Sequence, residues 1–254
     1  MTNPREDFEI NALGSFNVLE AARLAEQPPV VFYSSTNKVY GGMEDLQIAD
    51  RGLQYDYADL PEGLPEDRCL DFHSPYGCSK GSADQYFRDY ARIYGLRTVV
   101  FRQSCIYGER QFGIEDQGWV AWFTIASCLG KPITIFGDGK QVRDVLYIQD
   151  LIQAFDMAYQ KIDVTAGQVY NIGGGRRYMM SLLELLNFLE KTLDRKISYK
   201  FSNWRPGDQK VYISDCAKAK REFGWEPLMS PQLGVNQLLN WVRQNQDTVL
   251  KVFP

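Results

Sequence analysis

Short runs of consecutive apolar residues alternate along this chain with longer segments in which apolar residues recur every three or four positions. Short runs of this kind are typical of strands that are buried on both faces of a parallel sheet, and the longer segments are typical of helices. The predicted strands are residues 30–34, 96–101, 133–136, 145–148 and 168–172. The predicted helices are residues 7–26, 74–95, 117–129, 149–161, 181–194, 215–223 and 231–246.

This alternation of strands and helices predicts βαβ units and therefore an α/β fold with a parallel sheet. The alternation becomes irregular after about residue 110, which predicts a smaller C-terminal lobe beside the sheet. We therefore expect a sheet domain over residues 1–110 and mainly a second lobe over 111–254, with some of its segments returning to the sheet. Residues 41–75 contain turn formers and acidic residues and are expected to form a long loop.

Composition narrows the class of protein. The net charge of −4 over 254 residues argues against a nucleic-acid-binding surface, and no apolar run has the roughly 18–20 residues that cross a bilayer. Five scattered cysteines without a CxxC pair, and an N-terminus without the apolar core of a signal peptide, predict a reduced cytoplasmic protein. The single histidine, His73, does not make a metal site alone, so no metal is expected.

Tyr76 and Lys80 are candidates for acid–base chemistry. They lie four positions apart in a predicted helix, so both side chains share one helix face. A nearby ammonium favours the phenolate and lowers the tyrosine pKa, and such a tyrosine can take a proton from a hydroxyl and return it. The spacing alone is a weak signal, because an ordinary amphipathic helix also produces it.

A second group of polar residues, Ser34, Ser35 and Thr36, ends the strand predicted at 30–34. The carboxyl ends of parallel strands form the edge where open α/β sheets bind ligands. A hydroxyl at Thr36 is therefore placed to exchange hydrogen bonds with a substrate hydroxyl. The plainer alternative is a polar strand end that is followed by a turn.

The order of these motifs resembles the extended short-chain dehydrogenase/reductase family, the NAD-dependent epimerases and dehydratases of nucleotide sugars. The matching stretches are DFEINALGSFNVLEA, YSSTNKVYG, SPYGCSK, FRQSCIYGERQ, GDGKQVRDVLYIQDL, NIGGG and RPGDQKVYISDCAKA. STNKVYG, RQFGIEDQGWVAWF and GDGKQVRDVL are also similar to the subfamily that epimerises CDP-paratose and CDP-tyvelose at C2. The resemblance implies a partial Rossmann NAD-binding domain over 1–110, a nucleotide-sugar-binding lobe over 111–254, NAD as cofactor and a CDP-sugar as the favoured substrate.

The resemblance also implies roles for individual residues. In the expected catalytic set, Tyr76 is the base, Lys80 tunes Tyr76 and holds the nicotinamide ribose, and Thr36 positions the sugar hydroxyl. The expected cofactor-binding residues are Asn11, Ser34, Ser35, Tyr76, Lys80, Gln103 and Ser104. The expected substrate-binding residues are Cys105, Thr134, Phe136, Arg143, Arg205 and Asp208.

Several of these assignments have plainer alternatives. Arg143 can pair with Asp144 or Asp150 on the surface, and Arg205 and Asp208 can stabilise a turn. Cys105 departs from the family, because many relatives carry an asparagine at this place. The glycines of NIGGG are interpreted as a turn that lets segments pack closely, because a bare glycine run is weak evidence for phosphate binding.

The family's glycine-rich turn, which seats the pyrophosphate of NAD, has no counterpart here, because the chain contains no G-x-x-G-x-x-G. We therefore expect a Rossmann-like sheet that is truncated at its N-terminal side. The expected function is an NAD-dependent epimerase of a CDP-sugar, and two alternatives stay open: a catalytically inactive protein that binds a nucleotide sugar, and another nucleotide-sugar epimerase or dehydratase. A 4,6-dehydratase is disfavoured, because Asn37 and Lys38 stand where dehydratases place an acidic pair. The family further implies a homodimer or homotetramer that forms through helices 7–26 and 76–94.

Overall fold

The computed structural model describes residues 3–253 and has a parallel three-stranded sheet at its centre. The strand order is β1 (Val31–Thr36), β4 (Thr98–Gln103) and β8 (Val169–Ile172). The ends of each strand differ by at most two residues from those of a predicted apolar run, so the α/β prediction is confirmed. Because β1 extends to Thr36, the serines and the threonine that follow its apolar residues belong to the strand itself.

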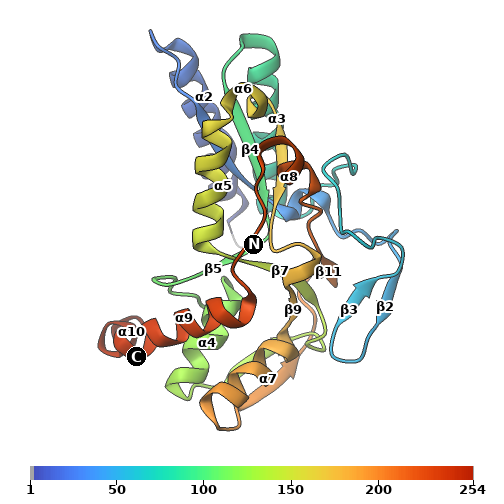
Figure 1. Cartoon of the computed structure of the whole chain (residues 1–254), viewed down its shortest axis with the longest axis vertical. Helices are drawn as coiled ribbons and strands as arrows, with labels where there is room; N and C mark the ends of the chain where they lie inside the picture. The colour runs from blue at the N-terminus through green and yellow to red at the C-terminus, as the bar shows by residue number, and fades with distance from the viewer. Residues whose placement is uncertain (1–2, 254) are drawn as a thin grey trace.

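Helices cover both faces of this sheet (Figure 1). One face packs against α2 (Gly14–Leu24) and α3 (Ser74–Tyr94), and the other against α5 (Ile148–Gln160) and α8 (Ala217–Phe223). α3 ends where predicted, because Gly95 adopts a φ of 67° that glycine accepts without strain. α2 is preceded by α1 (Pro4–Asp7) and by a π-helical turn, η1 (Phe8–Leu13).

A second body of structure has its own apolar core, built largely from α4, α7 and α9, in the lower part of Figure 1. Its four-stranded sheet has the order β11, β7, β5, and β9 pairs antiparallel with β7, while β6 and β10 form a separate parallel pair. The strands are β5 (Cys105–Tyr107), β6 (Ile133–Phe136), β7 (Val142–Tyr147), β9 (Met179–Ser181), β10 (Tyr199–Ser202) and β11 (Val211–Tyr212). The helices are α4 (Trp119–Leu129), α7 (Leu182–Leu193), α9 (Pro231–Gln244) and α10 (Gln246–Val252).

Some short elements were not predicted. The segment 41–75 contains a hairpin of β2 (Ile48–Asp50) and β3 (Tyr55–Tyr57), so it is not wholly irregular. Strands of three residues are too short to show a pattern of alternation in the sequence. The hairpin also depends on a tight turn, in which Gly52 has a φ of 92°. The other unpredicted elements are α1, α6 (Ile162–Thr165), α10, β5, β9 and the short turns η2 (Asn37–Tyr40) and η3 (Arg176–Tyr178).

Two local arrangements of residues shape this part of the fold. Ser181 caps α7 in a capping box with Glu184. In NIGGG, a Cβ on Gly173 would lie 2.1 Å from a carboxylate oxygen of Asp144, and one on Gly174 would lie 2.4 Å from the Val145 carbonyl oxygen. These glycines therefore allow close packing of the strand ends.

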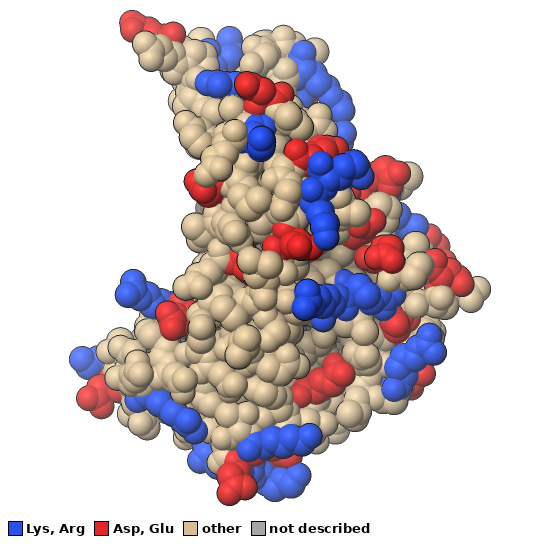
Figure 2. Space-filling view, viewed as in Figure 1, with Lys and Arg blue, Asp and Glu red and all other residues tan. Residues whose placement is uncertain are grey.

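On the face shown in Figure 2, the distribution of charged side chains does not mark a specialised binding surface. Acidic and basic side chains are interspersed over the face shown in Figure 2, rather than gathered into one field of a single sign. This distribution agrees with the small net charge of −4. Within residues 3–253, no helix combines the length and the apolar character that crossing a membrane requires.

Candidate active site

The carboxyl end of β1 and the first turns of α3 bring the expected catalytic residues together. Thr36 lies close enough to Tyr76 that its side chain lowers the pKa of the Tyr76 phenol. The Lys80 ammonium donates to the Ser34 carbonyl at 2.5 Å and lies 4.5 Å from the centre of the Tyr33 ring. A tyrosine, a threonine and a lysine thus surround one strand end, as the sequence predicted.

The electrostatics of this group are dominated by burial. Burial raises the pKa of Tyr76, and the Thr36 side chain is the main influence that lowers it. Burial also lowers the pKa of Lys80, while the nearby Asp84 carboxylate opposes that change. Lys80 is not among the groups that shift the pKa of Tyr76, and its ammonium is bound to the Ser34 carbonyl instead.

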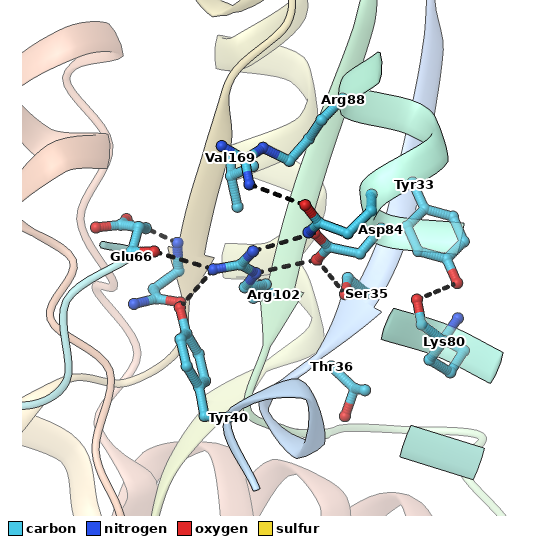
Figure 3. Close-up of polar contacts among 12 residues, drawn as sticks. Tyr33, Ser35, Thr36, Tyr40, Glu66, Lys80, Asp84, Arg88, Arg102 and Val169 are labelled. Carbon is cyan, nitrogen blue, oxygen red and sulfur yellow. Dashed lines mark hydrogen bonds and ion pairs between the residues drawn. The ribbon is translucent and has the colours of Figure 1, made fainter. Parts of the chain in front are cut away.

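Beneath these residues, a buried ion pair fastens α3 to the sheet (Figure 3). Arg102 in β4 donates to both carboxylate oxygens of Asp84, at 3.0 and 3.1 Å, and both side chains are at most 1% exposed. Ser35 donates to the same carboxylate at 2.7 Å. This pair was not predicted from the sequence, although Asp84 continues the four-residue spacing of Tyr76 and Lys80.

The pair continues into a polar network on the other side of Arg102. Arg102 Nη1 donates to the Tyr40 hydroxyl at 3.1 Å and to the Glu66 carbonyl at 3.0 Å. Burial raises the pKa of Tyr40 to about 12, so its hydroxyl remains protonated and donates to Asn171 at 2.7 Å. The segment after Thr36, the long loop and β8 are therefore joined to the same guanidinium.

The expected cofactor-binding residues divide into two groups. Ser34 and Gln103 lie together at neighbouring strand ends, since Gln103 Nε2 donates to Ser34 Oγ at 3.1 Å. Ser35 and Ser104 instead donate to buried carboxylates, those of Asp84 and Asp144. Adjacent strand residues point to opposite faces, so the side chains of Ser34 and Ser35 do not share one side.

Asn11 and the open face of β1 complete this region. Asn11 lies in the π-helical turn and donates to Ser79, the neighbour of Lys80, at 3.3 Å. Tyr76 is 41% exposed and Ser34 is also exposed, so polar groups face open space at this strand end. Hydroxyl, ammonium and carbonyl groups in this arrangement fit the ribose hydroxyls of a nicotinamide nucleotide.

The expected substrate-binding residues lie beside this group. Arg143 is buried and donates to the Asp208 carboxylate at 2.9 Å, so its predicted alternative partners, Asp144 and Asp150, are wrong. Asp144 is fully buried and accepts backbone hydrogen bonds from residues of other segments. Asp150 accepts from the backbone before α9. Arg143 and Asp208 are thus brought together although they are distant in the sequence.

A third group lies on β6 and on the turn that contains Arg205. The Arg205 guanidinium lies 3.8 Å from the centre of the Phe136 ring and donates to Asp116 at 2.8 Å. Thr134 is in the same strand as Phe136 and pairs with β10. An aromatic ring covered by a guanidinium is a suitable platform for a flat nucleobase.

Cys105 and Gln209 connect these groups to the strand end. The Cys105 sulfur accepts from the Trp119 indole at 3.3 Å, and burial raises the pKa of this thiol, so it remains protonated. The Gln209 side chain donates to the Gly41 carbonyl at 2.7 Å and accepts from Asn37 at 3.4 Å. The segment after Arg205 is therefore docked on the turn that follows Thr36.

Comparisons with known proteins agree with this geometry. The NAD dependent epimerase/dehydratase family matches residues 1–173. CDP-paratose 2-epimerase of Salmonella typhi is 46% identical over 94% of this chain and 72% of that protein. The structure of UDP-glucose 4-epimerase from Thermotoga maritima with UDP-glucose has 30% identity and a TM-score of 0.80, over 96% of this chain and 73% of that one.

A further solved structure contains both ligands of such a site. UDP-glucuronic acid 4-epimerase from Bacillus cereus, in complex with UDP-glucuronic acid and NAD, has 27% identity and a TM-score of 0.77. The similarity covers 92% of this chain and 67% of that chain. The matched motifs, the parallel sheet and the residues gathered at its strand ends lead to one conclusion: this chain belongs to the NAD-dependent epimerase/dehydratase family.

Proposed function

We propose that this chain carries the catalytic residues of an NAD-dependent epimerase that inverts C2 of a CDP-linked sugar such as CDP-paratose or CDP-tyvelose. The observation that carries the proposal is the gathering of Thr36, Tyr76 and Lys80 at the carboxyl end of β1, where the Lys80 ammonium is bound to the Ser34 carbonyl. The 46% identity to a protein named CDP-paratose 2-epimerase supports the choice of nucleotide and of carbon.

Each residue of the group has a task in this reaction. In its phenolate form, Tyr76 takes the proton of the sugar hydroxyl as the hydride leaves the same carbon, and it returns that proton when the hydride comes back to the other face. Thr36 forms a hydrogen bond with the same hydroxyl, and Lys80 and Ser34 hold the ribose of the cofactor. Bound NAD supplies a hydride acceptor that is restored within each turnover. Tyr76 begins and ends the cycle in the same protonation state, so the reaction has no net redox change.

The second body of structure is proposed to hold the nucleotide sugar, in agreement with the expected division near residue 110. Arg143 and Arg205 supply guanidinium groups, whose planar forks suit phosphate oxygens. Phe136 supplies a ring for the base, and Thr134 lies in the same strand. Five free cysteines support a reducing location, the cytoplasm.

Other activities are less well supported. Dehydratases place an acidic pair directly after the catalytic hydroxyl, but here Asn37, which is bonded to Gln209, and Lys38, which lies beside Asp208, follow Thr36. A protein that binds a nucleotide sugar without turnover is the second candidate. The residues that favour it are Arg143, Asp208, Arg205 and Phe136, which need no NAD to hold a nucleotide.

One experiment separates these candidates. The chain is incubated with NAD and CDP-tyvelose, and proton NMR follows the signal of the hydrogen at C2, with Tyr76→Phe as the matched variant. Appearance of the C2 epimer with the natural chain, and its loss with Tyr76→Phe, supports the epimerase. Binding of CDP without any epimer, by a chain that does not retain NAD, supports the second candidate.

Self-association is a separate part of the proposal. The apolar residues that η1, α2 and α3 leave exposed include Phe8, Ile10, Tyr86, Ile93 and Tyr94, which are 47–65% exposed. Exposed apolar patches of this kind mark protein contacts, so we infer a homodimer or homotetramer that forms through helices 7–26 and 76–94. Light scattering tests it, and the double variant Ile10→Glu/Ile93→Glu is expected to be a monomer.

A further inference from the structure

Lys38 is fixed to the catalytic strand end by its backbone. It follows Thr36 by two residues in the short turn η2, and its backbone N–H donates to Thr36 Oγ1 at 3.2 Å. That bond caps the turn, so the direction in which the Lys38 side chain leaves the backbone is set by the threonine itself. The turn therefore holds the Lys38 backbone close to the Thr36 side chain.

The Lys38 side chain reaches the turn that contains Asp208. Its ammonium lies 3.4 Å from the Gly207 carbonyl oxygen and 3.6 Å from a carboxylate oxygen of Asp208. The same oxygen of Asp208 accepts from Arg143 at 2.9 Å. One carboxylate thus faces two cations, which leaves one positive charge in excess.

The positive charges of Lys38 and Arg143 are only partly neutralised by the single carboxylate of Asp208. Burial lowers the pKa of Lys38, and the positive charge of Arg143 lowers it further, while Asp208 only partly opposes these effects. Arg143 is 8% exposed and has no freedom to move its charge into water. A second anion at this place would therefore be stabilised by both cations.

The position of the Lys38 ammonium also suits a substrate that reacts at C2 of the sugar. In a nucleotide sugar, C2 is bonded to the anomeric carbon, which carries the diphosphate. A substrate whose C2 hydroxyl reaches Thr36 and Tyr76 therefore brings its β-phosphate within a few bonds of the same residues. In a sugar that reacts at C4, the diphosphate lies across the ring from the reacting hydroxyl. A cation two residues after Thr36 suits the first geometry.

We propose that Lys38 binds the β-phosphate of the nucleotide sugar together with Arg143, and that Asp208 is the counterion that occupies both cations until the diphosphate replaces it. The inference rests on the proposed function, because it takes a nucleoside diphosphate sugar as the ligand. Lys38 thereby favours substrates that react next to the anomeric carbon.

The test measures binding of CDP and of CMP by calorimetry, which needs neither NAD nor turnover. Lys38→Met is compared with Lys38→Arg and with Lys220→Met, which removes a lysine from an exposed pair with Glu226. We expect Lys38→Met to weaken CDP binding by about tenfold or more and CMP binding much less, because loss of one hydrogen bond between charged groups has roughly this effect. Lys38→Arg should retain most of the affinity, and Lys220→Met should retain all of it.

The remaining outcomes separate the two levels of the proposal. If the natural chain binds neither CDP nor UDP, the proposed function fails. If the natural chain binds CDP but Lys38→Met binds it equally well, or loses CDP and CMP affinity to the same extent, the role of Lys38 is wrong. Asp208→Asn should bind CDP as tightly as the natural chain or more tightly, and a loss of affinity in this variant would contradict the counterion role.

Discussion

Asp84 and Arg102 form a two-pronged ion pair that is sealed from solvent and joins the helix of Tyr76 to the central strand of the sheet. Asp84 lies one helical turn beyond Lys80 and two turns beyond Tyr76 on α3. The pair therefore fixes how far along the sheet the helix sits. Ser35 donates to the same carboxylate, so the neighbour of Thr36 is tied to the same point.

Removing the charge of Asp84 should destabilise the whole fold. In Asp84→Asn, the Arg102 guanidinium stays buried without its counterion, and loss of one partner of a buried pair lowers the free energy of unfolding by about 3–5 kcal/mol. Urea denaturation measures the change. Asp89→Asn makes the same substitution at an exposed position of α3 and should have little effect. Equal stability of the two variants would show that the pair does not fasten the helix.

The hydroxyls of Ser34 and Ser35 should respond differently to removal. Ser35→Ala deletes a buried donor to the Asp84 carboxylate, and hydrogen bonds to charged groups contribute about 1.5–3 kcal/mol. Ser34→Ala deletes an exposed hydroxyl that accepts from Gln103, so its effect on the unfolding free energy should be well below that of Ser35→Ala. Urea midpoints of the two alanine variants provide the comparison, and the reverse order would exchange their roles.

Gly173 should not tolerate a side chain. The Cβ of Gly173→Ala would lie 2.1 Å from an Asp144 oxygen and 2.5 Å from Ser214 Oγ, both in a buried region. Overpacking of this kind lowers the unfolding free energy by about 1–3 kcal/mol. Gly14→Ala is the control, because its Cβ meets only ordinary contact at 3.5 Å in a helix, where alanine gains up to about 1 kcal/mol. A melting temperature of Gly173→Ala equal to that of the natural chain would contradict this packing.

The sequence predicted the elements whose patterns are local, and missed contacts between distant segments. The apolar run that became β4 and the four-residue spacing on α3 were visible in single windows of sequence. The pairing of Arg102 with Asp84 was not, because it depends on how the helix packs against the strand. The same holds for Arg143, whose nearest acids in sequence are not its partners, and which instead meets Asp208.

The opposite directions of the Ser34 and Ser35 side chains are predictable from the local sequence once both residues are assigned to one strand. Successive side chains of a strand point to opposite faces, and β1 extends through both serines. The apolar run ends before Ser35, so the sequence alone shows no alternation beyond Ser34. Once the strand includes Thr36, one serine faces Gln103 and the other faces α3.

Acid should weaken the contact between α2 and α3 through Glu20. Hydrogen bonds from Arg23 and from the Tyr90 hydroxyl, together with the charge of Arg23, lower the pKa of Glu20 from 4.5 to about 2. A carboxyl group whose pKa is lower in the folded state stabilises the fold above its unfolded pKa, and this contribution is lost as the pH falls from 4.5 toward about 2. Glu20→Gln should therefore lower the urea midpoint at neutral pH, and its difference from the natural chain should shrink as the pH falls below 4.5.

Glu26→Gln changes an exposed glutamate just beyond the same helix and should not reproduce this pH dependence. A difference between Glu20→Gln and the natural chain that stays constant across this acid range would show that the charge of Glu20 does not join the two helices.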